Sequence, residues 1–318
     1  MSNNSVKKRG FVQREATAAL DKLDAMLPDD IYLIPVMLED CEPPQKIKDR
    51  IQFTDIRRPD FWPTLVASLR LAASQRDIDF PSTETHGPFQ IRTHILKEEV
   101  PGDDGYQIQI EYPEFSSAAF SDAAEELTQF FKARASKESI SARSYAWWIP
   151  PGHPSWSRGS TRSDSFSVHA CTEELVSIVY TIDTYASGTP HPNHDFEVFN
   201  FRIGPKITPF STIDFFDYGG LARISSLCAE KLKQQYWERT GEEANEEVIS
   251  TGFIQGTKPD WANFQRVAFG PSGITCLFPP YQVGAYVLGS WAVDISHYEL
   301  RDAAPDTWYS AIFEPKQQ

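Results

Sequence analysis

Three stretches of this 318-residue chain alternate apolar and polar residues. They are YQIQIEY at 106–112, LVSIVYTIDTY at 175–185 and WAVDISHY at 291–298. Because successive side chains of a β-strand point to opposite faces, this alternation is typical of strands with one buried and one solvated face. Two helices are expected between them, at about 118–135 and 219–238, where apolar residues recur at helical spacing. The pattern predicts an α+β domain with a mainly antiparallel sheet.

Composition limits the classes of function that this chain can serve. A hydrophobic fraction of 41% is enough to build buried cores, and the length allows two domains. The formal net charge of -14 opposes binding to nucleic acid, which requires a basic surface. The 4 cysteines show no paired spacing typical of zinc sites or disulfide frameworks. With no apolar run of about 18 residues and no signal peptide, we expect a cytoplasmic protein that binds neither nucleic acid nor membrane.

Residues 1–73 have a different pattern. The expected elements are a helix at 11–27, strands at 29–38 and 51–56, and a helix at 59–72 with Phe61, Trp62, Leu65, Leu69 and Ala72 on its buried face. The run DDIYLIPVML at 29–38 is continuously apolar, which is typical of a strand covered on both faces in a parallel sheet. This order indicates the second half of a doubly wound α/β unit. Glu15 lies at the margin of the apolar stripe of the first helix.

Three blocks of this region, NSVKKRGFVQRE, DDIYLIPVMLEDCEPP and IQFTDI…FWPTLVASLR, occur in an order that resembles the C-terminal half of a bacterial TIR (Toll/interleukin-1 receptor-like) domain. The resemblance implies a partial flavodoxin-like sheet, TIR–TIR self-association and, in catalytic members, cleavage of NAD. The residue that matches the catalytic glutamate of those members is Glu15. A carboxylate suits this reaction, because breaking the nicotinamide–ribose bond develops positive charge on the sugar.

The first half of such a domain would precede Ser2 and is not encoded in this chain. A sheet of two parallel strands is marginal, and a nucleotide site at the carboxyl ends of strands needs the missing ones. Two explanations stay open: Met1 is an internal methionine of a longer protein, or the region is a remnant that caps the next domain. As written, the chain is expected to be enzymatically inactive and without a cofactor, with NAD a substrate only of a completed domain and Glu15 an ordinary carboxylate.

Residues 74–88, SQRDIDFPSTETHGP, are polar and aperiodic, so we expect a linker there, followed by a domain at 89–303 and a tail at 304–318. The domain contains the blocks IQIEYPEF, SIVYTIDTYASGTPHPNHDFEVFNF, STIDFFD and FGPSGITCLFPPYQVGAYVLGSWAVDISHYEL. These resemble the extracytoplasmic domain of RsiV-type anti-sigma factors, a module also appended to some peptidoglycan deacetylases. The resemblance implies a recognition module, because the understood role in that family is binding of a protein ligand, lysozyme.

One candidate site is the stretch TPHPNHD at 189–195, which holds three side chains able to bind a metal: His191, His194 and Asp195. Its two prolines make a rigid turn, so the histidines do not share a helix face as zinc ligands of hydrolases do. We expect a structural turn that contributes His191 and His194 to ligand binding and holds no metal. A metal-dependent hydrolase is the weaker alternative.

A second candidate is the aromatic stretch YAWWIPPGHPSW at 145–156. Trp147, Trp148 and Trp156 beside prolines either line a groove for a peptide or glycan, or fold as a loop over the core.

The combined prediction is a signalling or defence protein whose second domain senses a protein or cell-wall ligand. In such a protein, the TIR part, if completed upstream, signals or cleaves NAD. The alternative is a non-enzymatic binding or inhibitory module.

Overall fold

A computed structural model of the chain describes residues 33–41, 53–58, 61–76, 83–101, 105–146, 159–301 and 303. The chain divides into two compact units, Met1–Pro81 and Ser82–Gln318. Among the helices of the described ranges, none is long and apolar enough to cross a membrane.

The described part of the first unit is a small α/β arrangement. Strand β1 (Val36–Met37) pairs in parallel with β2 (Thr54–Asp55), and helix α4 (Phe61–Ser74) follows. Phe61 is buried, whereas Trp62 is 65% and Leu69 is 40% exposed, so the expected buried face of α4 was wrong at these two positions. Each lies roughly 80 to 100° around the helix from Phe61 and cannot share its direction. Two paired strands do not make a flavodoxin-like sheet, and that expectation is not established by the described residues.

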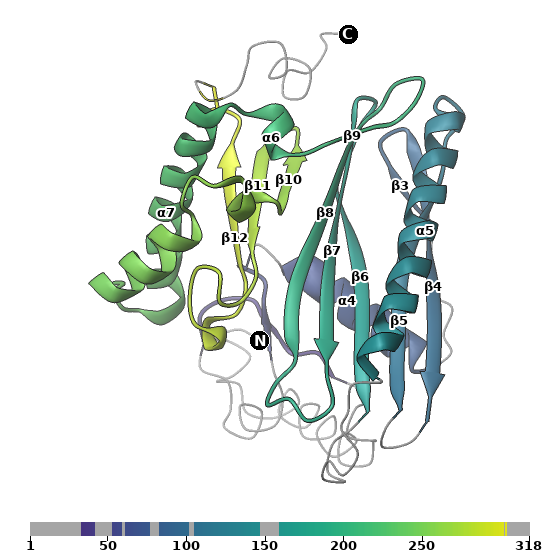
Figure 1. Cartoon of the computed structure of the whole chain (residues 1–318), viewed down its shortest axis with the longest axis horizontal. Helices are drawn as coiled ribbons and strands as arrows, with labels where there is room; N and C mark the ends of the chain where they lie inside the picture. Colours follow the sequence, from purple (N-terminus) through teal and green to yellow (C-terminus); the bar gives the residue numbers. More distant parts are fainter. Residues whose placement is uncertain are drawn as a thin grey trace, which may run out of the picture. The chain divides into compact units, whose positions relative to one another are not determined.

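The second unit is built on a seven-stranded sheet whose strands follow sequence order (Figure 1). Its strands are β3 (Thr83–His86), β4 (Phe89–Val100), β5 (Tyr106–Ser116), β6 (Ser160–Cys171), β7 (Leu175–Tyr185), β8 (Asn193–Arg202) and β9 (Thr208–Phe210). All neighbours pair antiparallel except β5 and β6, which are parallel. The predicted mainly antiparallel sheet is therefore confirmed. Residues 83–86, which were expected to belong to a linker, form strand β3. They pair with β4 because Gly87, at φ 52, allows a tight turn between the two strands.

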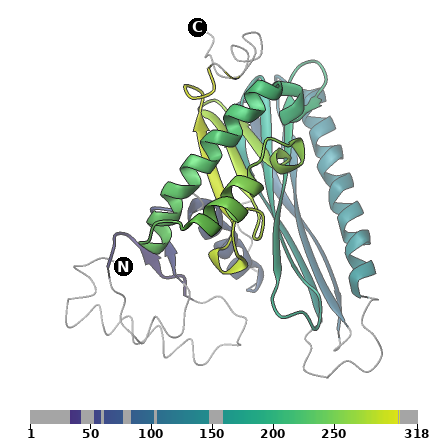
Figure 2. The same ribbon diagram turned by 60° about the vertical axis from the view of Figure 1, so that its left-hand side comes forward.

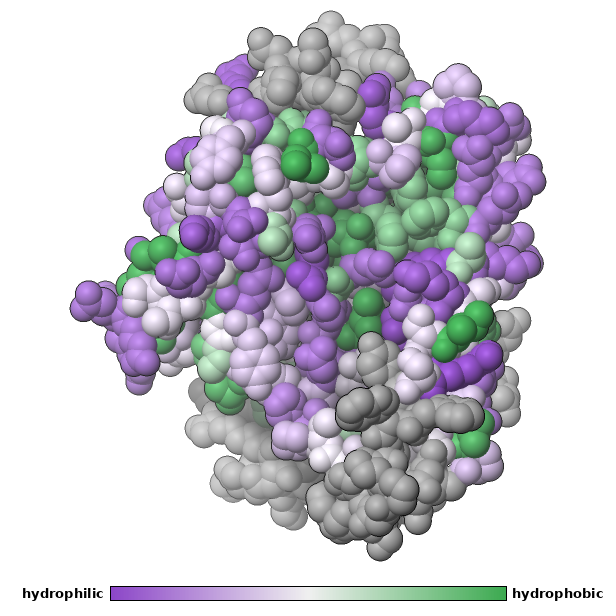
Figure 3. Space-filling view, in the orientation of Figure 1, coloured by the Kyte–Doolittle hydropathy of each residue, from purple (hydrophilic) through white to green (hydrophobic). Residues whose placement is uncertain are grey.

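Helix α5 (Ser121–Ala146) connects the two parallel strands, which cannot be joined by a short turn, and packs along the sheet (Figure 1). It extends beyond the expected end at 135 because Ala135 and Ala142 pack against Ile108 and Ile110 of β5. The core under the helix is aromatic, with Phe89, Phe131, Tyr180 and Phe201 fully buried. Hydrophobic residues remain visible over α5 and β8 on this face (Figure 3).

A second, three-stranded antiparallel sheet follows, in the order β10–β11–β12. Its strands are β10 (Val267–Gly270), β11 (Gly273–Phe278) and β12 (Trp291–Ser296). Helix α7 (Tyr218–Thr240) runs across this sheet (Figure 2), begins at Asp217, whose carboxylate accepts from the Gly220 N–H, and ends at Gly241 in the left-handed conformation. Shorter elements are α6 (Thr212–Phe215), the π-helix η1 (Val248–Ile254), and the 3₁₀ turns η2 (Trp261–Phe264) and η3 (Tyr286–Leu288).

The side-chain amide of Asn200 joins the two sheets. Its Nδ2 donates to the Val267 carbonyl at 2.8 Å, and its Oδ1 accepts from the Phe269 N–H at 3.2 Å and from the Ser177 hydroxyl at 2.7 Å. Asn200 of β8 thereby pairs with the backbone of β10 as a neighbouring strand would. Beside it, Val179 packs against Ala268 and Leu277, so an apolar layer also holds the two sheets together.

Candidate ligand-recognition surface

Two loops that are far apart in the sequence meet at the surface of the second unit. The β7–β8 loop contributes His191, and the β11–β12 loop contributes Tyr281 and Tyr286. The rings of His191 and Tyr286 stack with centroids 3.8 Å apart, and the His191 Nε2 lies 3.3 Å from the Tyr281 hydroxyl oxygen. The Tyr286 hydroxyl donates to the Pro192 carbonyl at 2.7 Å. We call His191, His194, Tyr281 and Tyr286 the recognition surface.

Tyr281 has an unusual backbone conformation at this surface. Its φ is 72°, and it is the only residue other than glycine with a positive φ within the described ranges. The left-handed conformation costs a residue with a Cβ about 1 kcal/mol, and such strain gathers at functional sites. The Tyr281 side chain is nevertheless 62% exposed, and nearby in the same loop Val287 is 88% exposed. The strain therefore does not serve to bury the ring.

The β11–β12 loop is also held by hydrogen bonds from Gln282, the residue after Tyr281. Gln282 Nε2 donates to the Gly256 carbonyl at 3.1 Å and to the Asn263 carbonyl at 3.0 Å. A Cβ at Gly256 would lie 2.0 Å from the Gln282 carbonyl oxygen, so only glycine allows this approach. Val283, the next residue, is fully buried. The exposed Tyr281 and the half-buried Tyr286 thus stand on a loop that is fixed to the core.

His194 extends the surface along β8. Its Nδ1 hydrogen bonds with Asp183 Oδ1 on β7, and its ring lies 6.2 Å from the Tyr286 ring, nearly parallel to it. The two histidines expected in ligand binding therefore both lie beside the ring of Tyr286. Tyr281 and Tyr286 were missed as site residues by sequence reasoning. The signal available was their occurrence in PPYQVGAY, where proline and glycine indicate a loop.

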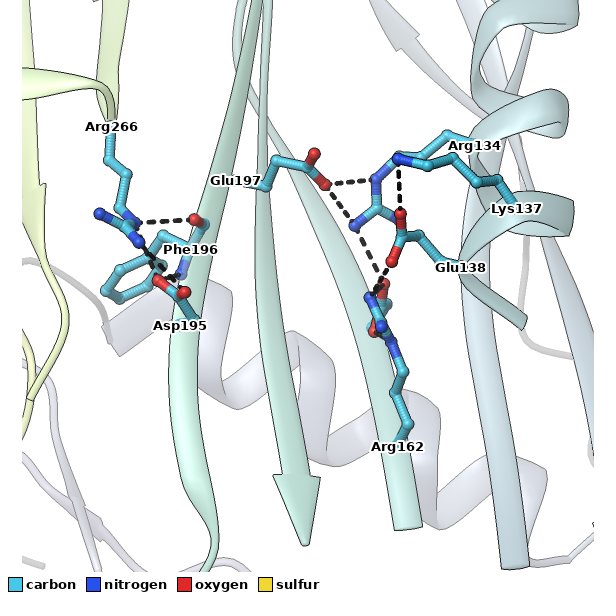
Figure 4. A network of polar contacts seen from close by, with 9 residues as sticks. Arg134, Lys137, Glu138, Arg162, Asp195, Phe196, Glu197 and Arg266 are labelled. Carbon is cyan, nitrogen blue, oxygen red and sulfur yellow. Dashed lines mark hydrogen bonds and ion pairs between the residues drawn. The ribbon is translucent and has the colours of Figure 1, made fainter. Parts of the chain in front are cut away.

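Asp195 does not join the two histidines. Arg266 Nε lies 2.8 Å from Asp195 Oδ1 and also donates to the Phe196 carbonyl at 3.0 Å (Figure 4). Because adjacent residues of a strand point to opposite faces, Asp195 cannot meet a metal that His194 binds. In the described part of the chain, no group of three potential ligands could hold a metal ion. The alternative of a metal-dependent hydrolase is thus wrong, because His191, His194 and Asp195 do not converge on one point.

The other sequence candidates cannot be placed. Glu15, Trp147, Trp148 and Trp156 lie outside the described residues. The proposed catalytic part of Glu15 and the groove expected from the tryptophans therefore stay predictions.

A buried ionic group between α5 and the sheet is the other dense polar feature. Arg134 donates to Glu197 at 2.7 Å and to Asp164 at 2.9 Å, while Arg162 contacts Asp164 at 2.7 Å and Glu138 at 3.0 Å (Figure 4). We call these five residues the α5 network. The Asp164 side chain is 0% and that of Arg134 5% exposed. The Glu197 side chain is 40% exposed, so the network runs from the buried Asp164 to the surface and joins α5 to β6 and β8.

Two groups in and beside this network have shifted pKa values. Burial lowers the pKa of Arg162, but its hydrogen bonds and charge interactions with Asp164 and Glu138 together outweigh burial and raise the pKa above the usual value. Tyr180 lies beneath the Arg134 guanidinium, whose Cζ is 3.6 Å from the ring centroid. Burial raises the pKa of Tyr180 far above that of an exposed phenol. Both groups therefore keep their protons, which suits a structural role.

Comparison with known proteins finds a family similarity in part of this unit. Residues 213–298 match the model of a protein family of unknown function, DUF3298. They include α7, the second sheet and the β11–β12 loop, whereas His191 and His194 lie outside the matched range. No curated protein matches the chain.

Two solved structures resemble the chain. A DUF3298 family member from Bacteroides fragilis has a TM-score of 0.50 at 16% identity, covering 70% of this chain and 96% of that one. A DUF3298 family protein from Pseudomonas aeruginosa has a TM-score of 0.46 at 14% identity, covering 69% and 96%. At such identity, the first likeness shows a shared fold. The family match does not reach the first unit, so the TIR resemblance stays a prediction.

Proposed function

We propose that the second unit is a non-enzymatic recognition module that binds a protein ligand through His191, His194, Tyr281 and Tyr286. The observation that carries the proposal is the meeting of two loops in one aromatic cluster at the surface, with Tyr281 exposed and held in a strained backbone conformation. Exposed tyrosines on a fixed backbone give large contact areas at little cost in conformational entropy. The resemblance to RsiV-type domains, whose ligand is lysozyme, agrees with this role.

The arrangement of the rings favours a protein over a glycan. Sugars bind aromatic side chains by stacking on a free ring face, but the nearest face of Tyr286 is already covered by His191 at 3.8 Å. Mixed aromatic, imidazole and aliphatic groups, including the exposed Val287, suit the centre of a protein interface better. The net charge of -14 would in addition speed encounter with a basic partner.

The proposal is tested by measuring binding of the purified full chain to immobilised lysozyme and, separately, to insoluble peptidoglycan. We expect saturable binding to lysozyme, weakened at least tenfold by Tyr281→Ala or Tyr286→Ala, as is typical of tyrosines at the centre of an interface. Tyr298→Ala is the matched control, because Tyr298 is 75% exposed and follows β12 at the opposite end of its sheet.

The possible results separate the alternatives. Retention on peptidoglycan that depends on the same tyrosines would replace the protein ligand by a glycan. Binding to lysozyme that Tyr281→Ala and Tyr286→Ala leave unchanged would remove the recognition surface from the interaction. Absence of binding to both materials would contradict the proposal.

The first unit enters this proposal only through the TIR resemblance of its sequence. In the sequence-based hypothesis, ligand binding by the second unit brings TIR parts together, and a completed TIR domain then signals or cleaves NAD. The parallel pairing of β1 with β2 followed by α4 agrees with an α/β unit. Release of nicotinamide from NAD by a version extended upstream, lost on Glu15→Ala, is the corresponding test. The non-enzymatic alternative expects no release.

A further inference from the structure

The side-chain donor hydrogens around the His191 ring are all directed into the protein. His191 Nδ1 lies 2.8 Å from the Pro192 carbonyl oxygen. Because a carbonyl only accepts, Nδ1 carries the proton of the neutral ring and Nε2 is an acceptor. The Tyr281 hydroxyl, 3.3 Å from that Nε2, therefore donates to it, and the Tyr286 hydroxyl donates to the Pro192 carbonyl. His191, Tyr281 and Tyr286 thus keep no side-chain donor for a ligand.

His194 has the same polarity. It lies directly opposite Asp183 in the pairing of β8 with β7, and its Nδ1 hydrogen bonds with Asp183 Oδ1. An ionised carboxylate has no hydrogen to donate, so Nδ1 is again the donor, and Nε2 of the neutral ring is an acceptor. The side chains of Asp183 and His194 are 46% and 40% exposed, so a ligand can reach both.

The recognition surface and Asp183 therefore present hydrogen-bond acceptors beside an aromatic ring. The ring of His194 lies 6.2 Å from that of Tyr286. A carbonyl or carboxylate of a ligand would meet lone pairs with no donor between them, and an unpaired polar group at an interface is unfavourable. A cation with several donors and no acceptor has the complementary polarity, and a nearby aromatic ring attracts it further.

We propose that Asp183 and His194, beside Tyr286, bind an arginine side chain of the protein ligand. The inference rests on the proposed recognition function and names the ligand group that this part of the surface selects. Arginine suits the site better than lysine, because its planar guanidinium directs five donors toward separate acceptors and stacks on aromatic rings. An ammonium group is a compact, strongly hydrated point charge.

The charged groups of the neighbouring elements leave Asp183 available to a cation from outside. Arg266 reaches β8 close to His194, but it is engaged by Asp195 and by the Phe196 carbonyl (Figure 4). Within the described ranges, Asp183 pairs with His194 and with neither lysine nor arginine. The net charge of -14 also favours approach of a basic partner.

The test uses N-acetyl-arginine amide as the probe and the purified full chain as the receptor. Binding is followed by NMR through the ring signals of His191 and His194, which are assigned with the variants His191→Gln and His194→Gln. N-acetyl-lysine amide and N-acetyl-citrulline amide are the controls, since citrulline has the shape of arginine without its charge. We expect saturable shifts of the His194 signals with the arginine amide, affinity for the lysine amide at least about threefold weaker, and no saturable shift with the citrulline amide.

A substitution that preserves shape tests the carboxylate. Asp183→Asn removes the negative charge and introduces donor hydrogens where the site presents acceptors. We expect a loss of at least about fivefold in affinity for the arginine amide, as for other hydrogen bonds to charged groups, and weaker binding to lysozyme. Asp122→Asn is the matched control, because it makes the same change in net charge but lies in the first turn of α5 and not on this surface.

The outcomes separate this inference from the proposed function. Absence of saturable shifts with the arginine amide, equal binding of the citrulline or lysine amide, or equal effects of Asp183→Asn and Asp122→Asn would each overturn the arginine site. If Asp183→Asn fails to fold, the three amides on the unaltered chain still decide. Binding of the arginine amide without binding of lysozyme contradicts only the proposed ligand. Lysozyme binding that Tyr286→Ala weakens and Asp183→Asn does not contradicts only the arginine site.

Discussion

The recognition surface and the α5 network use similar side chains for opposite purposes. Both combine aromatic rings with hydrogen-bonded polar groups on strands β7 and β8 or beside them. In the α5 network, Arg134 covers Tyr180, whose ring is fully buried. On the recognition surface, His191 covers Tyr286, but Tyr281 beside it remains 62% exposed. Solvent exposure of the aromatic side chain therefore distinguishes a surface that a ligand can reach from a contact that only stabilises the fold.

The two regions also differ in where the fold tolerates strain. The α5 network lies on a helix and regular strands, and Arg134, Arg162 and Asp164 are paired while largely buried, with Glu197 at its exposed margin. The β11–β12 loop keeps Tyr281 at a positive φ and needs glycine at 256 to approach the core. A purely structural loop would gain stability by placing glycine at 281. Retaining a tyrosine there is understandable if its side chain has a binding role.

The largest effect is expected from breaking the α5 network. Arg134→Leu removes the partner of Asp164 and Glu197, leaving Asp164 with Arg162 alone in a fully buried position. Loss of one partner from a buried ion pair typically costs about 3–5 kcal/mol. We expect a decrease of this size in the free energy of unfolding, measured by urea denaturation.

An exposed ion pair on the same helix is the matched control. Lys206 lies 2.8 Å from Glu126 of α5 and is 69% exposed. Since exposed pairs are screened by water, Lys206→Ala should lower the free energy of unfolding far less than Arg134→Leu does. Equal losses in the free energy of unfolding for Arg134→Leu and Lys206→Ala would show that burial does not make the ion pairs of Arg134 more stabilising than an exposed pair.

The next effect comes from the close approach under the recognition surface. Gly256→Ala places a Cβ 2.0 Å from the Gln282 carbonyl oxygen, so the loop must move. We expect a loss of about 1–3 kcal/mol, as in other overpacked cores, and weakened ligand binding although residue 256 carries no contact side chain. Gly204→Ala is the control, because its added Cβ would meet only the Lys206 carbonyl oxygen at an ordinary 3.5 Å. Unchanged binding by Gly256→Ala would mean that the loop position is unimportant.

The sequence predicts the strands of the sheet better than it predicts the recognition surface. Alternation in YQIQIEY and LVSIVYTIDTY correctly predicted strands. The solvated face expected for the second of them was wrong, because the first six residues of β7 are all buried and Val179 packs against Ala268 and Leu277 of the second sheet. The aromatic cluster could not be predicted, because His191 and Tyr281 are 90 residues apart and meet only through the packing of the two sheets. Asp195 was misassigned for a related reason. Nothing local indicates that Arg266, which is 71 residues away, contacts it.

A smaller effect is expected at Tyr281 itself. Tyr281→Gly relieves the left-handed backbone, whereas Tyr281→Ala keeps a Cβ and hence the strain. We expect the glycine variant to be more stable than the alanine variant by about 1 kcal/mol, the reverse of the order at ordinary positions. Both variants should lose ligand binding alike. Thermal denaturation of the two proteins side by side checks the order, and a more stable alanine variant would contradict a strained backbone.

The smallest effect concerns pH at the far end of α5. The hydroxyl of Tyr106 and the guanidinium of Arg143 hold the pKa of Glu98 below its usual 4.5. A carboxyl group whose pKa is lowered in the folded state stabilises the fold above its unfolded pKa, and this contribution is lost as the pH falls through the folded value. Glu98→Gln should therefore cost less than about 1 kcal/mol at neutral pH, given the partial exposure of the pair, and progressively less on acidification below about pH 4.5. Urea denaturation of both proteins across this range measures the difference. A difference that stays constant with pH would assign the effect to packing of the side chain and not to its charge.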